Sequence, residues 1–185
     1  MKFNAHSNLL GEHAFLIASN YHWLNYDLNK LTDRYLRHLA VERGTQLHEY
    51  AAMAIRLGLK QPKSRQTLCM YINDAIGYRM TPEQPLYYSP NCVGTADAIA
   101  FDKNFLRIHD LKTGETATSF HQLEIYAGLF CLEYRYKPDE LNGIELRIYQ
   151  NNEMRVETPN PEDIYGVMKT IELFDQQIEK LKVEG

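Results

Sequence analysis

The chain has 185 residues, the length of a single domain, and 44% of them are hydrophobic while 24% are charged. This composition is typical of an ordinary soluble globular protein and excludes disordered, fibrous and membrane-embedded classes. The formal net charge of −4 argues, at face value, against a nucleic-acid binder that works through bulk positive charge.

The first half of the chain predicts mainly helical structure. We expect Thr32 to cap a long helix over residues 33–59, and a second helix to follow over about residues 65–78. Pro82 and Pro85 are expected to break the chain before a β region. The apolar residues at helical spacing in the first helix are Leu36, Ala40, Leu47, Ala51 and Ile55.

The hydrophobic pattern changes to a period of two from Tyr87 onward. Residues 93–101 and 105–112 are predicted to form two strands joined by a tight turn at residues 102–104. A further strand pair, GIELRIYQ and EMRVETP, is joined across two asparagines. The spacing therefore predicts two strand pairs in the second half of the chain.

Two more helices are predicted around these strands. The first covers residues 119–135, with Thr118 or Ser119 as its N-cap. The second begins at Asn160-Pro161, where a cap, a proline and two acids form a strong helix start. Its expected buried stripe consists of Ile164, Val167, Met168, Ile171, Phe174, Ile178 and Leu181.

The order of these elements predicts an α/β fold with a mixed central β-sheet flanked by helices. We expect one domain over residues 1–185, mainly helical over residues 1–80 and with the sheet and the chemistry over residues 81–185.

The cysteines and the N-terminal sequence bear on cofactors and location. Cys69, Cys92 and Cys131 are far apart and form no CxxC pair, so we expect buried thiols and no zinc or iron–sulfur site. Residues 1–13 contain no apolar signal core, and the apolar run at residues 126–132 is far shorter than the roughly 18 residues of a membrane span. We therefore expect an intracellular protein with no membrane partner.

An acid and a lysine end the predicted strand at residues 105–112. Strand side chains alternate between faces, so Asp110 and Lys112 are expected to share the face of Leu106 and Ile108. Asp97 on the preceding strand is expected near Asp110, and two close carboxylates repel unless a cation lies between them. Hard oxygen ligands favour Mg²⁺ or Mn²⁺, beside which a lysine can position a water or stabilise charge. Taken alone, the Asp-x-Lys motif is more typical of a surface ion pair on an edge strand, with Asp97 in a turn.

Three other residues can join this site. His48 lies four residues after Gly44 in the first long helix and can reach a metal or a phosphate. Gln122 and Tyr126, also four residues apart, can bond phosphate oxygens or orient the lysine. Each has a structural alternative, because most helical histidines are structural and Tyr126 can serve core packing.

The order and spacing of these motifs resemble the RecB-like branch of the PD-(D/E)XK nuclease superfamily. The motifs are GxxxH (44–48), GTAD (94–97), DLKTG (110–114) and QxxxYA (122–127), and the resemblance covers roughly residues 40–130. This branch includes nuclease domains of bacterial recombination helicase-nucleases, CRISPR-adaptation nucleases and phage recombination exonucleases. The resemblance implies a restriction-endonuclease-like core of αβββαβ layout.

The resemblance also implies a site for one or two Mg²⁺ or Mn²⁺ ions. The metal ligands would be His48, Asp97, Asp110 and the backbone carbonyl of Leu111. The catalytic residues would be Asp97, Asp110, Lys112, Gln122 and Tyr126. The chain departs from some relatives in lacking the four cysteines of an iron–sulfur cluster, and Ala96 stands where the superfamily often has proline.

The function that follows is metal-dependent hydrolysis of DNA phosphodiester bonds. The leading expectation is an exonuclease acting on DNA ends or single strands in phage or bacterial recombination or replication, in the cytoplasm of the bacterium or infected host. The alternatives are an endonuclease on the same core, or a catalytically inactive DNA-binding member of the fold. A homo-oligomer or a recombination partner protein fits either enzyme.

Aromatic and basic residues offer contacts to DNA. Tyr21, Trp23 and Tyr26 cluster near the N-terminus and can stack on unpaired bases, or can pack in the core. The basic residues that can follow a phosphate backbone, or form a solvated surface, are Arg34, Arg37, Arg43, Lys60, Lys63 and Arg65. Because part of the acidity is expected to be metal ligands, the net charge of −4 does not exclude DNA.

Overall fold

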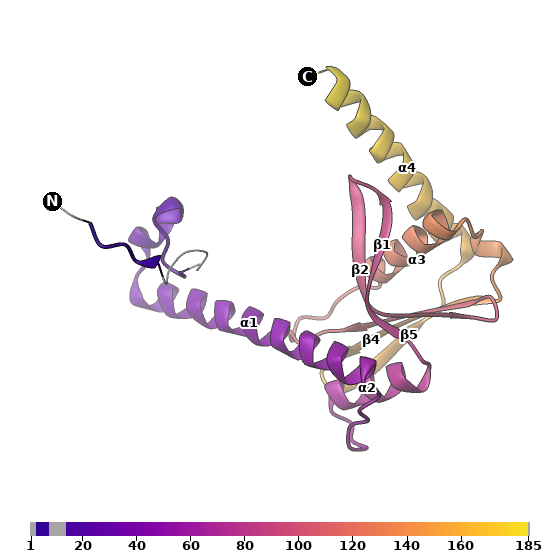
Figure 1. The fold of residues 1–185 in the computed structure, drawn as a ribbon, viewed down its shortest axis with the longest axis horizontal. Helices are drawn as coiled ribbons and strands as arrows, with labels where there is room; N and C mark the ends of the chain where they lie inside the picture. The colour runs from indigo at the N-terminus through magenta and orange to yellow at the C-terminus, as the bar shows by residue number, and fades with distance from the viewer. Residues whose placement is uncertain (1–2, 8–13, 185) are drawn as a thin grey trace. The chain divides into compact units, whose positions relative to one another are not determined.

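The computed structural model describes residues 3–7 and 14–184 (Figure 1). The chain divides into two compact units, Met1–Thr45 and Gln46–Gly185. The boundary between them lies inside the long helix α1 (Leu28–Arg56), so this helix contributes to both units.

The first unit contains the 3-10 helix η2 (Ala18–Asn25) and the first turns of α1. The carboxylate of Asp27 accepts a hydrogen bond from the Lys30 N–H at 2.7 Å, so Asp27 caps α1. The prediction of Thr32 as the cap is wrong, because its hydroxyl donates to the Leu28 carbonyl one turn back inside the helix. The predicted apolar stripe is buried only in the second unit, where α1 meets the sheet.

The second unit is built on a five-stranded mixed sheet in the order β1-β2-β3-β4-β5. The strands are β1 (Thr81–Ser89), β2 (Cys92–Asp102), β3 (Phe105–Leu111), β4 (Gly143–Gln150) and β5 (Glu153–Glu157). Only β3 and β4 are parallel, and α3 (His121–Tyr134) and the short η3 (Pro138–Glu140) connect them. The α/β fold with a mixed central sheet is confirmed.

Two tight turns follow the sequence prediction. Lys103 and Asn104 between β2 and β3 both have positive φ, as do Asn151 and Asn152 between β4 and β5. Positive φ at both central positions gives a two-residue turn whose twist matches the strands it joins. The two predicted strand pairs are therefore confirmed.

The expected break at the prolines is wrong. Pro82 and Pro85 lie inside β1, paired with Ala98 and Thr95 of β2. A strand at the edge of a sheet tolerates proline, because one side of its backbone has no ladder partner. The β region therefore begins at Thr81 rather than after the prolines.

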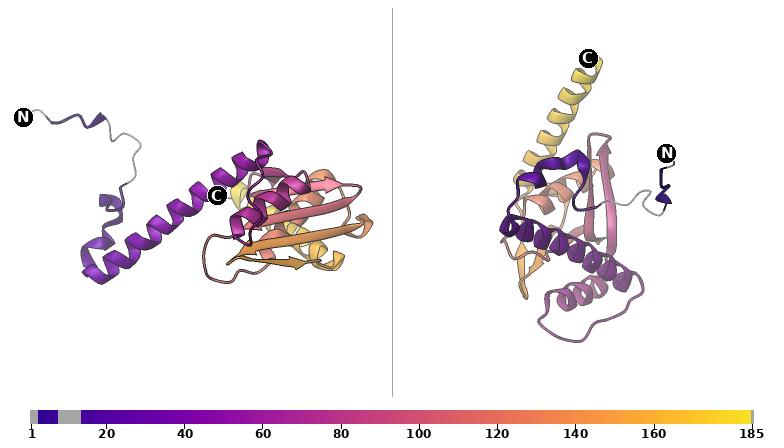
Figure 2. Two further views of the ribbon diagram at one scale, coloured as in Figure 1. Left: turned by 90° about the horizontal axis from the view of Figure 1, so that it is seen from below. Right: turned by 90° about the vertical axis from the view of Figure 1, so that its left-hand side faces the viewer.

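Helices cover both faces of this sheet (Figure 2). One core lies between the sheet, α3 and α4 (Pro161–Glu184), and includes Leu106, Ile108 and Leu146. The other lies between the sheet, α2 (Thr67–Gly77) and the end of α1, and includes Ala98 and Leu111. The alternation predicted for β3 is therefore confirmed for its apolar residues.

The ends of α3 and α4 differ from the predictions. Neither Thr118 nor Ser119 caps α3, which starts after Phe120, and the Thr118 carbonyl instead accepts a hydrogen bond from Arg155 of β5. The start of α4 at Pro161 is confirmed. The stripe of α4 is buried at Ile164 and half-buried at the next three positions, whereas its last three residues are exposed. This end of α4 contacts β1 and the β1–β2 turn through polar side chains such as Asp175 and Lys182 instead. These exposed residues are Phe174, Ile178 and Leu181.

The thiols of Cys69, Cys92 and Cys131 are all free, and Cys92 is half-buried rather than buried. Within the described ranges, each helix is too short or too polar to span a lipid bilayer.

Candidate functional site

The predicted site residues meet where the main-chain ladder between β2 and β3 ends. Ala98 and His109 form the last pair of the ladder. Two residues further along β3, the N–H of Leu111 donates to the Asp97 carboxylate at 2.9 Å. A side chain thus takes the place of a main-chain acceptor. Asp97 is fixed between the strands, and Leu111 is held on its other side by pairing with Tyr149 of β4.

Three side chains in this position can hold a metal ion. Nδ1 of His48, from α1, lies 3.4 Å from Oδ2 of Asp97. One ligand atom each from His48, Glu83 and Asp97 lie within 4.8 Å of one another, and all three side chains are half-buried. These atoms are imidazole nitrogen and carboxylate oxygen, the donor types that Mg²⁺ and Mn²⁺ sites in proteins can use.

Glu83 was not predicted. It belongs to β1, between the pairs Pro82–Ala98 and Gln84–Ala96, and therefore lies opposite Asp97 in the register. Its backbone has a φ of 51°, an uncommon conformation for a residue with a long side chain. The signal in the sequence was an acid between two prolines, and it was missed because that segment was expected to be a break.

Asp110 is buried next to this group and is only 1% exposed. Its Oδ1 accepts a hydrogen bond from Lys112 Nζ at 3.0 Å, whereas its buried Oδ2 has no hydrogen-bond partner among residues 3–7 and 14–184. Burial, followed by the charge of Asp97, raises the pKa of Asp110 to about 6, against the opposing effects of Lys112 and His48. Asp110 is therefore a buried acid with one oxygen left for a further cation.

Lys112 is held by two acceptors. In addition to the bond to Asp110, its ammonium donates to Oε1 of Gln122 at 2.8 Å. The Gln122 amide in turn donates to the Tyr126 hydroxyl at 2.7 Å, one turn further along α3. The structure thus brings together Lys112, Gln122 and Tyr126 as a continuous chain of hydrogen bonds.

Gly94 of the GTAD motif makes room for this chain. A Cβ at Gly94 would lie 2.7 Å from Cε1 of Tyr126, closer than real Cβ atoms approach another carbon. The Tyr126 ring therefore packs directly on the β2 backbone. The pKa of Tyr126 is raised chiefly by burial, so its hydroxyl remains protonated at neutral pH.

Negative charge is in excess in this region. Burial and then the charge of Asp97 raise the pKa of Glu83, while the hydrogen bond to Asp97 is the main cause of a raised pKa at His48. Tyr71 of α2, a second residue that was not predicted, has a pKa well above its ordinary value because of burial and of the nearby acids. Three carboxylates thus face Lys112 and His48, with Arg56 as a further, smaller positive influence on Glu83, an arrangement that favours a bound cation.

No family model matches the chain. A search of curated proteins likewise finds no match. The function must therefore be inferred from the site itself.

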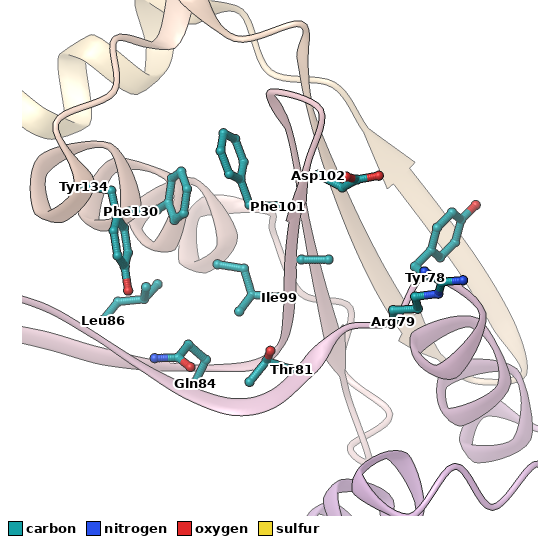
Figure 3. A pocket seen from close by; sticks show the side chains of 11 residues that line it. Tyr78, Arg79, Thr81, Gln84, Leu86, Ile99, Phe101, Asp102, Phe130 and Tyr134 are labelled. Atoms are coloured by element: carbon teal, nitrogen blue, oxygen red, sulfur yellow. The ribbon is translucent and has the colours of Figure 1, made fainter.

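One further cavity in this unit lies apart from the site. It has a volume of about 410 Å³ and is lined by residues such as Tyr78, Leu86, Phe101 and Tyr134 (Figure 3). None of its lining residues belongs to the group around Asp97 and Asp110.

Proposed function

We propose that the protein is a metal-dependent DNA nuclease of the PD-(D/E)XK type. The observation that carries the proposal is the buried Oδ2 of Asp110, which has no partner in the described part of the chain. It lies beside the His48–Glu83–Asp97 group and next to a lysine held in place. Burying a carboxylate oxygen without a partner is costly, so such an atom at a cluster of further acids indicates a cation ligand.

The donor set fits a hard divalent cation. His48, Glu83 and Asp97 would hold it, with Oδ2 of Asp110 as a further ligand, and the resemblance adds the carbonyl of Leu111. When bound, Mg²⁺ or Mn²⁺ polarises a phosphoryl oxygen, lowers the pKa of the attacking water and stabilises the leaving oxygen.

The chain's own residues supply positioning and positive charge. The Lys112 ammonium can exchange one of its two hydrogen bonds for a phosphate oxygen or for the attacking water. Gln122 keeps the ammonium in place, and the Tyr126 hydroxyl keeps the Gln122 amide oriented with its oxygen toward the lysine. Gln122 and Tyr126 both belong to α3, one helical turn apart, so their hydrogen bond is local to that helix.

The fold supports the same proposal. The core elements follow the order helix, three antiparallel strands, helix and a fourth strand parallel to the third, which matches the αβββαβ layout that the resemblance implies. The acids and the lysine lie where the ladder between β2 and β3 ends, with Asp97 in the middle of β2 and Asp110 near the end of β3. Within this proposal, an exonuclease acting on DNA ends or single strands is the leading activity, in the phage or bacterial recombination setting of the relatives it resembles.

The test is degradation of end-labelled DNA by the full chain. We expect single- or double-stranded linear DNA to be degraded with Mn²⁺ or Mg²⁺, and EDTA to abolish the reaction. Asp110→Asn should lose activity, whereas Asp102→Asn, at an exposed acid of the β2–β3 turn, should keep it. Cleavage by Asp110→Asn at the wild-type rate would overturn the site.

The form of the substrate separates the remaining alternatives. An exonuclease degrades linear but not circular single-stranded DNA, and an endonuclease cuts both. DNA binding without any degradation in Mn²⁺, by a protein that binds the metal in calorimetry, would leave the inactive DNA-binding alternative.

A further inference from the structure

The first unit contains a pocket that combines aromatic and basic side chains. It has a volume of about 310 Å³, at the lower end of the range of small-ligand pockets. It lies between η2, α1 and the segment before η2. The lining residues that matter here are Phe15, Trp23, Tyr26, Arg34, Arg37 and His38.

Two of the three aromatic rings of this pocket, those of Trp23 and Phe15, are held by contacts within the first unit. The Trp23 indole N–H donates to the Ile17 carbonyl at 2.9 Å, which fixes the plane of the indole. Phe15 packs edge-on against Tyr35 with ring centroids 5.2 Å apart, and its ring centroid lies 5.3 Å from that of His38. Rings fixed in this way lose little freedom when a flat ligand stacks on them.

Two arginines bring positive charge to the same pocket. Arg34 and Arg37 are three residues apart on α1 and therefore share a helix face. Both are exposed, and among residues 3–7 and 14–184 neither forms an ion pair; the ion pair recorded in this unit joins His38 and Glu42. Two unpaired guanidinium groups beside a ring-lined cavity fit an anionic ligand with a planar part.

We propose that this pocket binds one nucleotide of single-stranded DNA, with the base among the rings and the phosphate on Arg34 and Arg37. The inference rests on the proposed function and adds a substrate class to it. A simple anion would have no use for three aromatic walls, and an apolar ligand would leave two arginines without a role. A base inside a duplex is paired and stacked, so it cannot enter the pocket.

Trp23 makes the pocket directly observable, because it is the one tryptophan of the chain. We would titrate the full-length protein with oligo(dT) of ten nucleotides and follow tryptophan fluorescence. The buffer would contain EDTA to prevent cleavage. We expect saturable quenching as a base stacks on the indole, and no comparable quenching by a blunt duplex of the same length.

Charge variants then test the binding of phosphate by the two arginines. Arg34→Gln combined with Arg37→Gln should weaken oligo(dT) binding by roughly tenfold or more. It should also reduce the slope of log K against log salt by about 0.7 for each phosphate that the protein no longer neutralises. Lys180→Gln removes one positive charge at an exposed position of α4 outside the pocket and should change neither. If the double variant fails to fold, as judged by circular dichroism, the same binding measurements are made on Arg34→Gln and Arg37→Gln separately.

The outcomes separate this inference from the proposed function. If the protein degrades DNA with Mn²⁺ but oligo(dT) leaves Trp23 fluorescence unchanged, or if the duplex quenches it equally, the pocket assignment is wrong and the nuclease stands. If oligo(dT) quenches Trp23 and the arginine variants weaken binding, the pocket stands even where no DNA is degraded, and only the nuclease proposal fails.

Discussion

His109 and Asp110 are neighbours on β3 and are both fully buried, yet they belong to two different polar clusters. His109 faces α2 and lies in what we call the arginine cluster, formed by Asp74, Arg107, His109, Glu145, Arg147 and Tyr149. Asp110 faces α3 and lies in the acid cluster, formed by His48, Glu83, Asp97, Asp110 and Lys112.

The arginine cluster balances its own charge. Nε of Arg147 and Nε of Arg107 lie 3.0 and 3.4 Å from the same oxygen of Glu145. Arg147 also pairs with Asp74 of α2 at 3.3 Å and donates to the Tyr78 hydroxyl. These contacts join β3, β4 and α2, so the cluster serves the architecture.

The acid cluster does not balance in this way. In the described part of the chain, the buried side-chain atoms without a hydrogen bond are Oδ2 of Asp110 and four atoms of the arginine cluster. Three of those four are nitrogens of Arg107, His109 and Arg147, and each lies within 4.0 Å of the fourth atom, Oε1 of Glu145. Asp110 Oδ2 has no such partner. A buried polar group therefore indicates a functional site when no group of the chain supplies its hydrogen bond or opposite charge and a bound ligand has to do so.

The largest expected effect comes from breaking the acid cluster. Asp110→Asn should reduce DNA cleavage roughly 1,000-fold, because a metal ligand and a partner of Lys112 are removed together. Its free energy of unfolding at pH 7 should stay the same or rise, because a buried charge is removed. Initial cleavage rates and urea unfolding measure the two effects. A variant that loses activity only because it unfolds would contradict this separation.

Breaking the arginine cluster should have the opposite profile. Arg147→Met leaves Asp74 without its cation and Glu145 with Arg107 alone, and should lower the free energy of unfolding by about 3–5 kcal/mol. Mn²⁺ binding by the folded protein should persist, as measured by calorimetry. Lys182→Met removes an exposed ion pair with Glu179 and should cost less than about 1 kcal/mol in the same urea assay.

The two neighbours on β3 should respond to pH in opposite directions. Burial lowers the pKa of His109 to about 3, so the unfolded state binds the proton more strongly and stability is lost as the pH falls from about 6.5 toward 3. The pKa of Asp110 is raised to about 6, so the folded state binds its proton more strongly and stability is gained between about pH 6 and 4.

Urea unfolding at pH 7 and pH 5 checks these signs. His109→Gln should remove the loss of stability that His109 causes at low pH. Its free energy of unfolding should fall by roughly 2 kcal/mol less than that of the wild type between pH 7 and pH 5. Asp110→Asn should remove the stability that protonation of Asp110 adds at low pH. The free energy of unfolding should then fall more steeply between pH 7 and pH 5 than in the wild type, by a similar amount. If the free energy of unfolding changes equally with pH in the two variants, His109 and Asp110 do not respond to pH in opposite directions.

The smallest expected effect concerns the orientation of the lysine. Tyr126→Phe removes the acceptor for the Gln122 amide and should lower kcat about tenfold at an unchanged KM, with a loss of stability near 1 kcal/mol. Tyr134→Phe, on the same helix at an exposed position, is the matched control. If KM rises and kcat is unchanged, Tyr126 contacts the substrate rather than positioning the lysine.

The parts of the fold that depend on local sequence were predictable. The turns at Lys103-Asn104 and Asn151-Asn152 follow from residues that tolerate positive φ, and the alternation along β3 placed Asp110 and Lys112 on the face of α3. The helical spacing of Gln122 and Tyr126 was equally local.

The rest required contacts that sequence spacing does not contain. Glu83 enters the acid cluster through the register of an edge strand, fourteen positions away from Asp97 in the chain. Arg107 and Arg147 alternate with apolar residues as solvent-facing side chains do, and only the packing of α2 on that face turns them into a charge network. The cap at Asp27 was missed because Thr32, five residues later, is also a residue type that commonly caps helices.

The strand order of the sheet repeats the order of the chain, and this has a consequence for synthesis on the ribosome. Each strand can pair with the one made just before it, except that β4 must wait for α3 before it can lie parallel to β3. All side chains of the acid cluster, together with Gln122 and Tyr126, are made before Glu145 and Arg147. A nascent chain therefore carries every metal ligand proposed here while the partners of Arg107 and Asp74 in the arginine cluster are still to be translated.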